Sequence, residues 1–232
     1  MSTFLQLCQG VSRESGTVHG VEPTSTSAQV GRLAKIVKWT AEAWVMIQNS
    51  RDNWRWMRAE FPSTALTVSG TARYTPASWN ITDFSRWITE KDSVSMYKNS
   101  TGVSDEGDLI YQPDFVNYRR TYERGTITNN RPSIYAISPA NEFCLGPRAD
   151  AVYRLNGDYM KAAVTLSASG DTPGCPARFH DIIIWKGVVL LADHDEVEPF
   201  YIARAQAKFA EFLTALERSQ LPQVSIGSEP LA

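Results

Sequence analysis

The sequence lacks the short motifs that mark the common enzyme and cofactor-binding classes. It contains no GxxxxGK[ST] phosphate-binding loop, no GxGxxG fingerprint, no HExxH zinc motif and no GxSxG nucleophile elbow. Only three of its 232 residues are His, so a mechanism based on imidazole has few possible centres. We therefore expect a protein that is not an enzyme, with no catalytic residue, no metal ligand and no cofactor.

Cysteine and long hydrophobic runs are scarce as well. The three cysteines, Cys8, Cys144 and Cys175, are odd in number and widely spaced, which argues against a disulfide framework and a CxxC metal site. The first residues show no secretory signal. No apolar run approaches the ~20 residues of a membrane span, because the longest, 182–192, is interrupted by a Lys-Gly pair. These features predict folding in a cytoplasm and no membrane association.

Neither sign of charge is in excess. The chain has 23 basic and 25 acidic residues, a formal net charge of -2, which argues against a dedicated nucleic-acid binder. In residues 51–58 (RDNWRWMR), however, three arginines alternate with two tryptophans, and such segments can bind single strands by stacking and phosphate contact. The preferred interpretation is that the tryptophans are buried and covered by arginine stems. A nucleic-acid-binding module that uses residues 51–58 stays open as the alternative.

Two further clusters have the residue types of reactive sites. Residues 193–196 (DHDE) have the residue types that bind a divalent ion. Side chains of adjacent residues point in different directions, however, so the preferred interpretation is an acidic junction before the last helix. Cys175 lies close to His180, which is the pairing of a cysteine hydrolase. Because Cys175 lies in a Pro-Gly-Cys-Pro turn, we give this third interpretation the least weight.

Helical periodicity occurs at both ends of the chain. It predicts helices over 3–15, from an N-cap at Ser27 to about Asn49, over 179–193 and over 197–218. In the last helix, the spacing predicts one apolar face, made of Phe200, Ala203, Ala207, Ala210, Leu213 and Leu216. Residues 222–232 have no core-forming pattern and are expected to form an extended tail.

The middle of the chain has the alternating pattern of strands. Residues 65–74 predict a hairpin that turns at Ser69-Gly70, and 153–165 predict a long strand with a bulge at Gly157. One short helix is expected over 115–124, closed by Gly125. Further strands are expected at 84–88, 93–97, 133–138 and 142–145.

The expected fold class is therefore α+β. Residues 1–56 and 176–221 are expected to form a small helical bundle, 57–175 a β-rich insertion, and 222–232 an extended C-terminal tail. Three of the seven tryptophans, Trp44, Trp54 and Trp56, are expected at the junction from helix to sheet, with a structural role.

Several segments occur in a characteristic order along the chain. They are 34–48 (AKIVKWTAEAWVMIQ), 51–57 (RDNWRWM), 74–76 (YTP) with 81–83 (ITD), 176–183 (PARFHDII) and 213–222 (LTALERSQLP). With these segments in this order, the chain resembles the head-to-tail adaptor (head-completion) proteins of tailed bacteriophages. The resemblance covers nearly the full length, and none of its motifs is catalytic.

The resemblance implies a structural protein of the virion, assembled in the host cytoplasm. Such adaptors form a ring, usually of twelve copies, under the portal, where they extend the DNA channel for genome ejection. They bind the portal protein and a downstream tail, stopper or nozzle protein, and genomic DNA passes without sequence-specific binding. The residues to which the resemblance assigns portal contact are Phe200, Phe209, Leu213, Leu216, Leu221, Val224, Ile226 and Leu231.

Overall fold

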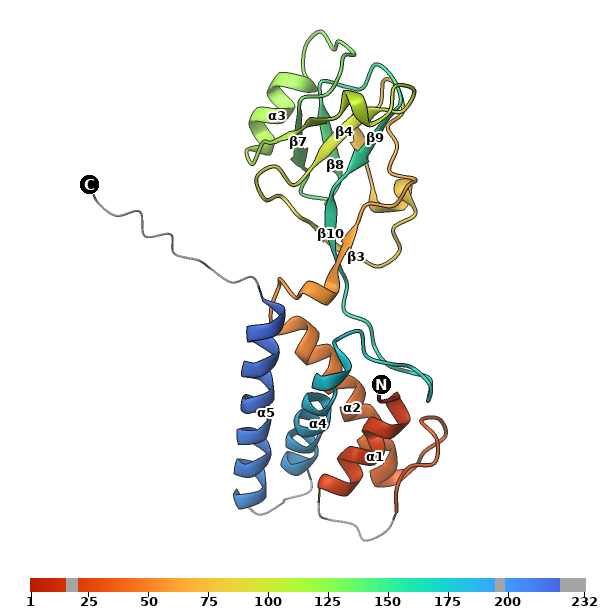
Figure 1. Cartoon of the computed structure of the whole chain (residues 1–232), viewed down its shortest axis with the longest axis vertical. Helices are drawn as coiled ribbons and strands as arrows, with labels where there is room; N and C mark the ends of the chain where they lie inside the picture. The colour runs from red at the N-terminus through yellow and green to blue at the C-terminus, as the bar shows by residue number, and fades with distance from the viewer. Residues whose placement is uncertain (16–20, 195–198, 222–232) are drawn as a thin grey trace, which may run out of the picture. The chain divides into compact units, whose positions relative to one another are not determined.

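The computed structural model describes residues 1–15, 21–194 and 199–221. The fold is mixed α+β, as expected, with five α-helices and several short sheets in the described ranges. The chain divides into two compact units, a helical unit of residues 1–57 and 163–232 and a β unit of residues 58–162 (Figure 1). Residues 163–175 thus group with the helices.

The helical unit is built around one apolar helix. Its α-helices are α1 (Phe4–Glu14), α2 (Gly31–Asn49), α4 (Asp181–His194) and α5 (Pro199–Gln220), with 3₁₀ turns η1 (Arg55–Met57) and η4 (Ala177–Phe179). Helix α4 packs against α1, α2 and α5 and lies between α1 and α5 in Figure 1. Helix α4 is apolar on most of its sides, and such a helix is stable here because the three neighbouring helices bury these sides.

Two glycines bring α1 and α4 close together. A Cβ atom on Gly187 of α4 would lie 2.8 Å from Cγ2 of Val11, and one on Gly10 of α1 would lie 2.5 Å from Cδ1 of Ile184. Both distances are shorter than van der Waals contact. The side chains of Val11 and Ile184 therefore occupy the space that any larger residue at these positions would need.

The β unit contains ten short strands, one α-helix and two 3₁₀ turns. Its three sheets have the strand orders β1-β10-β3, β2-β8-β7-β6 and β5-β4-β9, and every pair is antiparallel except β6 with β7. The elements are β1 (Arg58–Glu60), β2 (Arg73–Tyr74), η2 (Pro76–Trp79), β3 (Phe84–Trp87), β4 (Ser95–Lys98), η3 (Val103–Asp105), β5 (Gly107–Asp108), β6 (Ile110–Tyr111), α3 (Phe115–Tyr122), β7 (Ile134–Ile137), β8 (Phe143–Gly146), β9 (Tyr153–Asn156) and β10 (Asp158–Lys161).

Backbone hydrogen bonds join two of these sheets into a closed circuit. Strands β5 and β6 belong to one extended stretch. In it, Leu109 N–H donates to Val94 O, next to β4, and Ile110 N–H donates to Ser133 O, next to β7. On the other side, Thr67 N–H donates to Tyr153 O of β9, and the same segment continues into β2, which pairs with β8. The circuit β9-β4-β5/β6-β7-β8-β2 thus returns to β9 and leaves few free strand edges.

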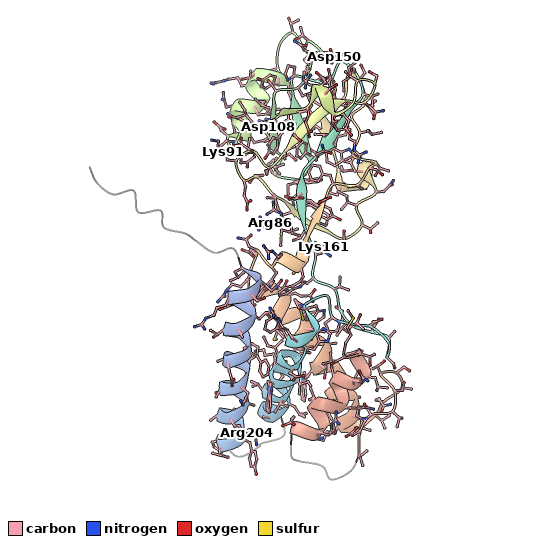
Figure 2. The ribbon with its side chains drawn as sticks, viewed as in Figure 1. Arg86, Lys91, Asp108, Asp150, Lys161 and Arg204 are labelled. Atoms are coloured by element: carbon pink, nitrogen blue, oxygen red, sulfur yellow. The ribbon has the colours of Figure 1, made fainter. Side chains whose placement is uncertain are left out.

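The remaining sheet has two edge strands, β1 and β3, and both carry charge. Arg58 and Glu60 are exposed on β1, and Arg86, labelled in Figure 2, lies on β3 opposite Met160 of β10. Charged side chains on an edge strand disfavour pairing with a strand of another molecule, because their charges would have to be desolvated.

Aromatic side chains fill the core of the β unit. The indole of Trp79, which is 1% exposed, has four ring neighbours: its centroid lies 5.4 Å from those of Phe61, Trp87 and Phe143 and 5.5 Å from that of Tyr74. Its Nε1 donates a hydrogen bond to Leu66 O at 3.3 Å. The indole thus contacts residues from several strands and loops at once.

Three local predictions are corrected by the structure. The expected hairpin at 65–74 is wrong, because its two limbs pair with β9 and β8 and not with each other, although Gly70 does turn the chain with a φ of 80°. The expected strand 153–165 is two strands that end at Lys161. Helix α2 starts after Val30, which offers no side-chain cap, and not after Ser27.

Candidate functional site

Helix α5 carries most of the residues to which the resemblance assigns portal contact. Phe200 lies at its start and is 72% exposed, and its ring meets that of the exposed Tyr201 edge-on at 5.8 Å. Phe209 and Leu213 are half-buried, and Leu216 is fully buried within the helical unit. Of these four residues, Phe200 therefore offers the most surface to another protein.

The apolar face expected for α5 is wrong in its orientation. Ala203, Ala207 and Ala210 are exposed, whereas the helix buries Ala205 and Leu216 and partly buries Ile202, Phe209, Phe212 and Leu213. The reason is that α4 packs against the side of α5 that carries the larger apolar residues, which remove more area from water than alanines do. We call the exposed set the α5 outer face; its members are Phe200, Ala203, Ala207, Ala210 and Thr214.

Charged side chains border the contact between α4 and α5. The Arg204 guanidinium lies 5.9 Å from the Trp185 ring, and the Lys186 ammonium lies 5.2 Å from the Phe209 ring. At the other end of α5, Glu217 pairs with Arg51 at 2.7 Å. These contacts hold α5 against its own unit and leave the outer face without a covering helix in the described part of the chain.

The last predicted contact residues fall at the end of the chain. Leu221 is half-buried, and its N–H donates to Glu217 O at 2.9 Å, which continues the helical hydrogen bonding by one residue. Val224, Ile226 and Leu231 lie outside the described residues.

The tryptophans at the end of α2 stack on one another. The centroids of Trp54 and Trp56 are 4.4 Å apart, and those of Trp44 and Trp56 are 6.4 Å apart. Trp44 and Trp54 are buried, and Trp54 Nε1 donates to Ile47 O at 3.1 Å. Base stacking needs an exposed ring face, so this arrangement argues against the nucleic-acid alternative.

The arginines of the same segment are also engaged within the chain. Besides the pair between Arg51 and Glu217, Arg58 pairs with Asp158 at 2.6 Å and with Glu90 at 3.6 Å. Arg55 is exposed. Two of the three guanidiniums that would contact phosphates are therefore already neutralised by carboxylates.

The possible hydrolase pair has the wrong geometry for nucleophilic catalysis. Cys175 is buried, and burial raises the pKa of its thiol to about 12, so the reactive thiolate is not formed near neutral pH. His180 is 3.2 Å from the main-chain oxygen of Cys175, so its near partner is a carbonyl and not the sulfur.

Neither a metal cluster nor a membrane-spanning helix occurs in the described part of the chain. Within these ranges, no three His, Cys, Asp or Glu side chains group closely enough to bind a metal ion, and the acidic cluster at 193–196 lies outside the side chains that the structure describes. Among the described helices, none combines the length and the apolar character needed to cross a bilayer.

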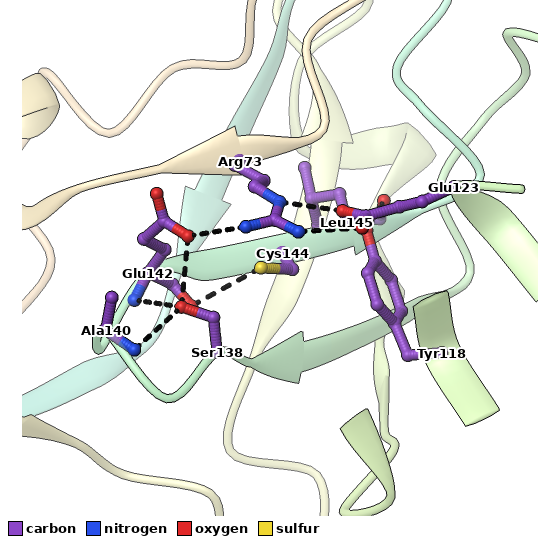
Figure 3. A network of polar contacts seen from close by, with 8 residues as sticks. All are labelled: Arg73, Tyr118, Glu123, Ser138, Ala140, Glu142, Cys144 and Leu145. Atoms are coloured by element: carbon purple, nitrogen blue, oxygen red, sulfur yellow. Dashed lines mark hydrogen bonds and ion pairs between the residues drawn. The ribbon is translucent and has the colours of Figure 1, made fainter. Parts of the chain in front are cut away.

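A polar network in the β unit is centred on Arg73 (Figure 3). Its guanidinium binds both carboxylate oxygens of Glu123 at 2.7 Å and one oxygen of Glu142 at 2.9 Å. The Ser138 hydroxyl donates to the same Glu142 oxygen at 3.0 Å, and Tyr118 donates to Leu145 O at 2.8 Å. Together these bonds hold α3 against β2 and β8.

Sequence patterns do not predict this network, and no local signal could have found it. Arg73 and Glu123 are 50 residues apart, and Arg73 and Glu142 are 69 apart. Each residue stands alone in its own segment, so only the folded chain brings the three charges together. The bidentate geometry is typical of strong Arg–carboxylate pairs, and it serves the fold here, because all three groups satisfy one another.

Arg73→Met is expected to lower the free energy of unfolding by about 1 kcal/mol at pH 7, a modest loss because solvent screens the partly exposed guanidinium. Its hydrogen bonds hold the pKa of Glu123 below the ordinary value. The contribution is therefore complete above the ordinary pKa and is lost as the pH falls through the lowered, folded-state value. Urea unfolding at pH 7 and pH 3 measures this loss.

The matched control for Arg73 is Lys91→Met, which also removes a positive charge (Figure 2). The Lys91 side chain is 92% exposed, and its ammonium forms a long ion pair of 3.9 Å with Asp92. We expect this control to change the stability little at either pH. Equal destabilisation by both substitutions at pH 7, or an Arg73 effect that persists in acid, would contradict a specific role for the Arg73–Glu123 pair.

Comparison with known families gives one match. The family model described as SU10 adaptor protein matches residues 2–229, which is nearly the whole chain and includes both units. No curated protein matches the sequence.

Proposed function

The chain belongs to the SU10 adaptor protein family, a phage head-tail adaptor family, and from this membership we propose that it is a structural subunit of the virion and not an enzyme. The observation that carries the proposal is the extent of the match. Because residues 2–229 are covered, the adaptor role applies to the helical and β units together and not to one of them.

In the proposed role, copies of the chain form a ring, with twelve subunits, between the portal and a downstream tail, stopper or nozzle protein. A cyclic interface joins two different surfaces of the same subunit, so each copy needs two complementary faces. The ring extends the DNA channel of the portal and provides the surface to which the tail attaches. Genome ejection then takes place through the ring.

The α5 outer face supports this proposal as a contact surface. Phe200 is large, apolar and 72% exposed, and side chains of this type bring much contact area to an interface at little entropic cost. The three alanines that follow it along the helix allow a partner to approach closely. We assign the portal contact to Phe200 and to the C-terminal residues Val224, Ile226 and Leu231. Leu216, which the resemblance included in this contact, is buried and is left out.

The charge balance supports passage of DNA. With 23 basic and 25 acidic residues, a ring of these chains has no large basic excess. Binding of DNA by basic surfaces gains free energy from counterion release, so a strongly basic channel would retain the genome. A nearly neutral chain is suited to a channel through which DNA passes without sequence-specific binding.

Electron microscopy of the chain mixed with its portal protein tests the function directly. We expect rings on the portal, and a Phe200→Ser variant is expected to bind the portal at least about 10-fold more weakly, as for an aromatic interface anchor. Its melting temperature should not change, because Phe200 contributes little to the fold. A chain that ends at Leu221 is expected to behave in the same way.

The matched control is Val30→Ser, which removes an apolar side chain that is 81% exposed on the same unit but not on α5. It should form rings with unchanged affinity. The absence of any complex with the portal at micromolar concentrations would overturn the proposed function, whereas equal affinities for the Phe200 and Val30 variants would overturn only the assignment of the α5 outer face.

A further inference from the structure

His180 is enclosed within the helical unit, between the first residues of the chain and the segment that leads into α4. It follows η4, directly precedes α4, and its side chain is 1% exposed. Its Nδ1 accepts a hydrogen bond from the Ser2 main-chain N–H at 3.1 Å, and its Nε2 lies 3.2 Å from the Cys175 carbonyl oxygen. The imidazole therefore links the first residues of the chain to the segment that leads into α4.

These two partners permit only one protonation state of the ring. A carbonyl oxygen can only accept, so Nε2 must carry the hydrogen, and a main-chain N–H can only donate, so Nδ1 must be unprotonated. Both bonds are therefore satisfied by the neutral imidazole in its Nε2–H tautomer. A second proton, on Nδ1, would face the Ser2 N–H, and the hydrogen bond between them would be lost.

Burial is the main influence on the charge of the ring. It lowers the pKa of His180, and the N-terminal amine adds a smaller repulsion, while the Cys175 carbonyl and the Asp181 carboxylate act in the opposite direction. The thiol of Cys175 is uncharged near neutral pH. The removal of the ring from water outweighs the attraction of Asp181, so the folded site holds the neutral form.

The bond from Ser2 is one of several that hold the start of α1. Phe4 N–H donates to Asp171 O at 2.7 Å, Leu5 N–H donates to Ser169 O at 3.2 Å, and Thr3 and Gln6 form a capping box. Those contacts contain no group that titrates between pH 5 and pH 8. A pH change in this range therefore acts on the Ser2 contact and leaves the rest of the helix start in place.

We propose that His180 is a pH-sensitive latch, which holds Ser2 against the segment before α4 while the ring is neutral and releases it when the ring is protonated. The sign follows from the folded-state pKa, which lies below that of a solvated imidazole. In the open form, in which Ser2 is released, the imidazole binds a proton more readily than in the closed form, in which Ser2 is held. The closed form is therefore fully stable above a pH of about 6.5 and loses stability as the pH falls below this value. This inference is independent of the adaptor role.

Hydrogen exchange of the full chain, followed by NMR and corrected for the intrinsic rate at each pH, tests the latch. From pH 7.5 to pH 5, protection of the Ser2 amide is expected to fall by up to about 30-fold, the limit set by an open-form pKa of about 6.5. The Thr3 amide, which donates to Gln6 Oε1, should keep its protection. Amides in the middle of α1, such as that of Val11, should keep their protection. Uniform loss along α1 would overturn the proposal, because it would indicate unfolding and not release of Ser2.

The matched variant is His180→Gln, whose amide can accept from Ser2 and donate to Cys175 O without titrating. Its protection at Ser2 should be the same at both pH values, and a loss equal to that of the natural chain would overturn the proposal. If this variant does not fold, titration of the His180 ring signal in the natural chain decides. A pKa at or above about 6.5 would refute the latch, and a lower value together with pH-dependent release would support it.

Discussion

Trp79→Ala is expected to destabilise the chain by about 3–5 kcal/mol, the usual cost of removing a large aromatic side chain from a core. The indole is almost fully buried and contacts Phe61, Tyr74, Trp87 and Phe143, so its removal leaves a cavity that four other rings cannot easily fill. The bond from Nε1 to Leu66 O is lost as well. Urea unfolding followed by circular dichroism measures the change.

Two further variants make the test of Trp79 specific. Trp79→Phe keeps most of the apolar volume and should cost clearly less than the alanine variant, because the residual cavity is smaller. Val68→Ala, at a position in the same unit that is 60% exposed, should change the stability by no more than about 0.5 kcal/mol. If Trp79→Ala proved as mild as Val68→Ala, the aromatic cluster would not be the centre of the β-unit core.

Gly187→Leu is expected to give the second largest loss, about 2 kcal/mol net. A Cβ at this position lies 2.8 Å from Cγ2 of Val11, whose branched side chain is itself buried, so the added atoms must push α1 away from α4. Overpacking of this kind typically costs about 1–3 kcal/mol, and the better helix propensity of leucine offsets less than about 1 kcal/mol of it. The melting temperature and urea midpoint report the result.

Gly170→Leu is the matched control for Gly187, since it introduces the same side chain in the same unit. The backbone of Gly170 does not have a positive φ, and a Cβ atom at this position would meet no other atom within 4 Å, so the leucine extends into open space. We expect a change near zero. A Gly187 variant as stable as this control would show that α1 and α4 can separate at no cost, contrary to the close contact between them.

Much of the helical unit could be predicted from the sequence. The helices at 4–14, 31–49, 181–194 and 199–220 all begin and end within a few residues of the expected positions. This success has a local cause, because apolar residues that recur every three or four positions favour a helix wherever the chain lies. The sequence predicts the start of α2 at Ser27, because serine is a favoured N-cap residue. The helix begins three residues later, after Val30, without a side-chain cap.

Strand pairing in the β unit could not be predicted in the same way. Residues 65–74 carry a good hairpin signal, and Gly70 does form a turn, but the limbs bond to β8 and β9, which lie about 70 to 90 residues further along the chain. An alternating pattern shows that a segment is extended and which side is apolar. It does not show which of several extended segments will be its neighbour.

The sequence by itself determined the fold class, the helices and the family of this protein, because these depend on periodicity and on residues read in order along the chain. Only the tertiary structure decided which side of α5 is exposed, that Trp54 is buried, and that Arg73 meets Glu123 and Glu142. Each of these depends on a partner that is distant in sequence. The exposed side chain of Phe200 makes the α5 outer face the contact surface that we propose to test first.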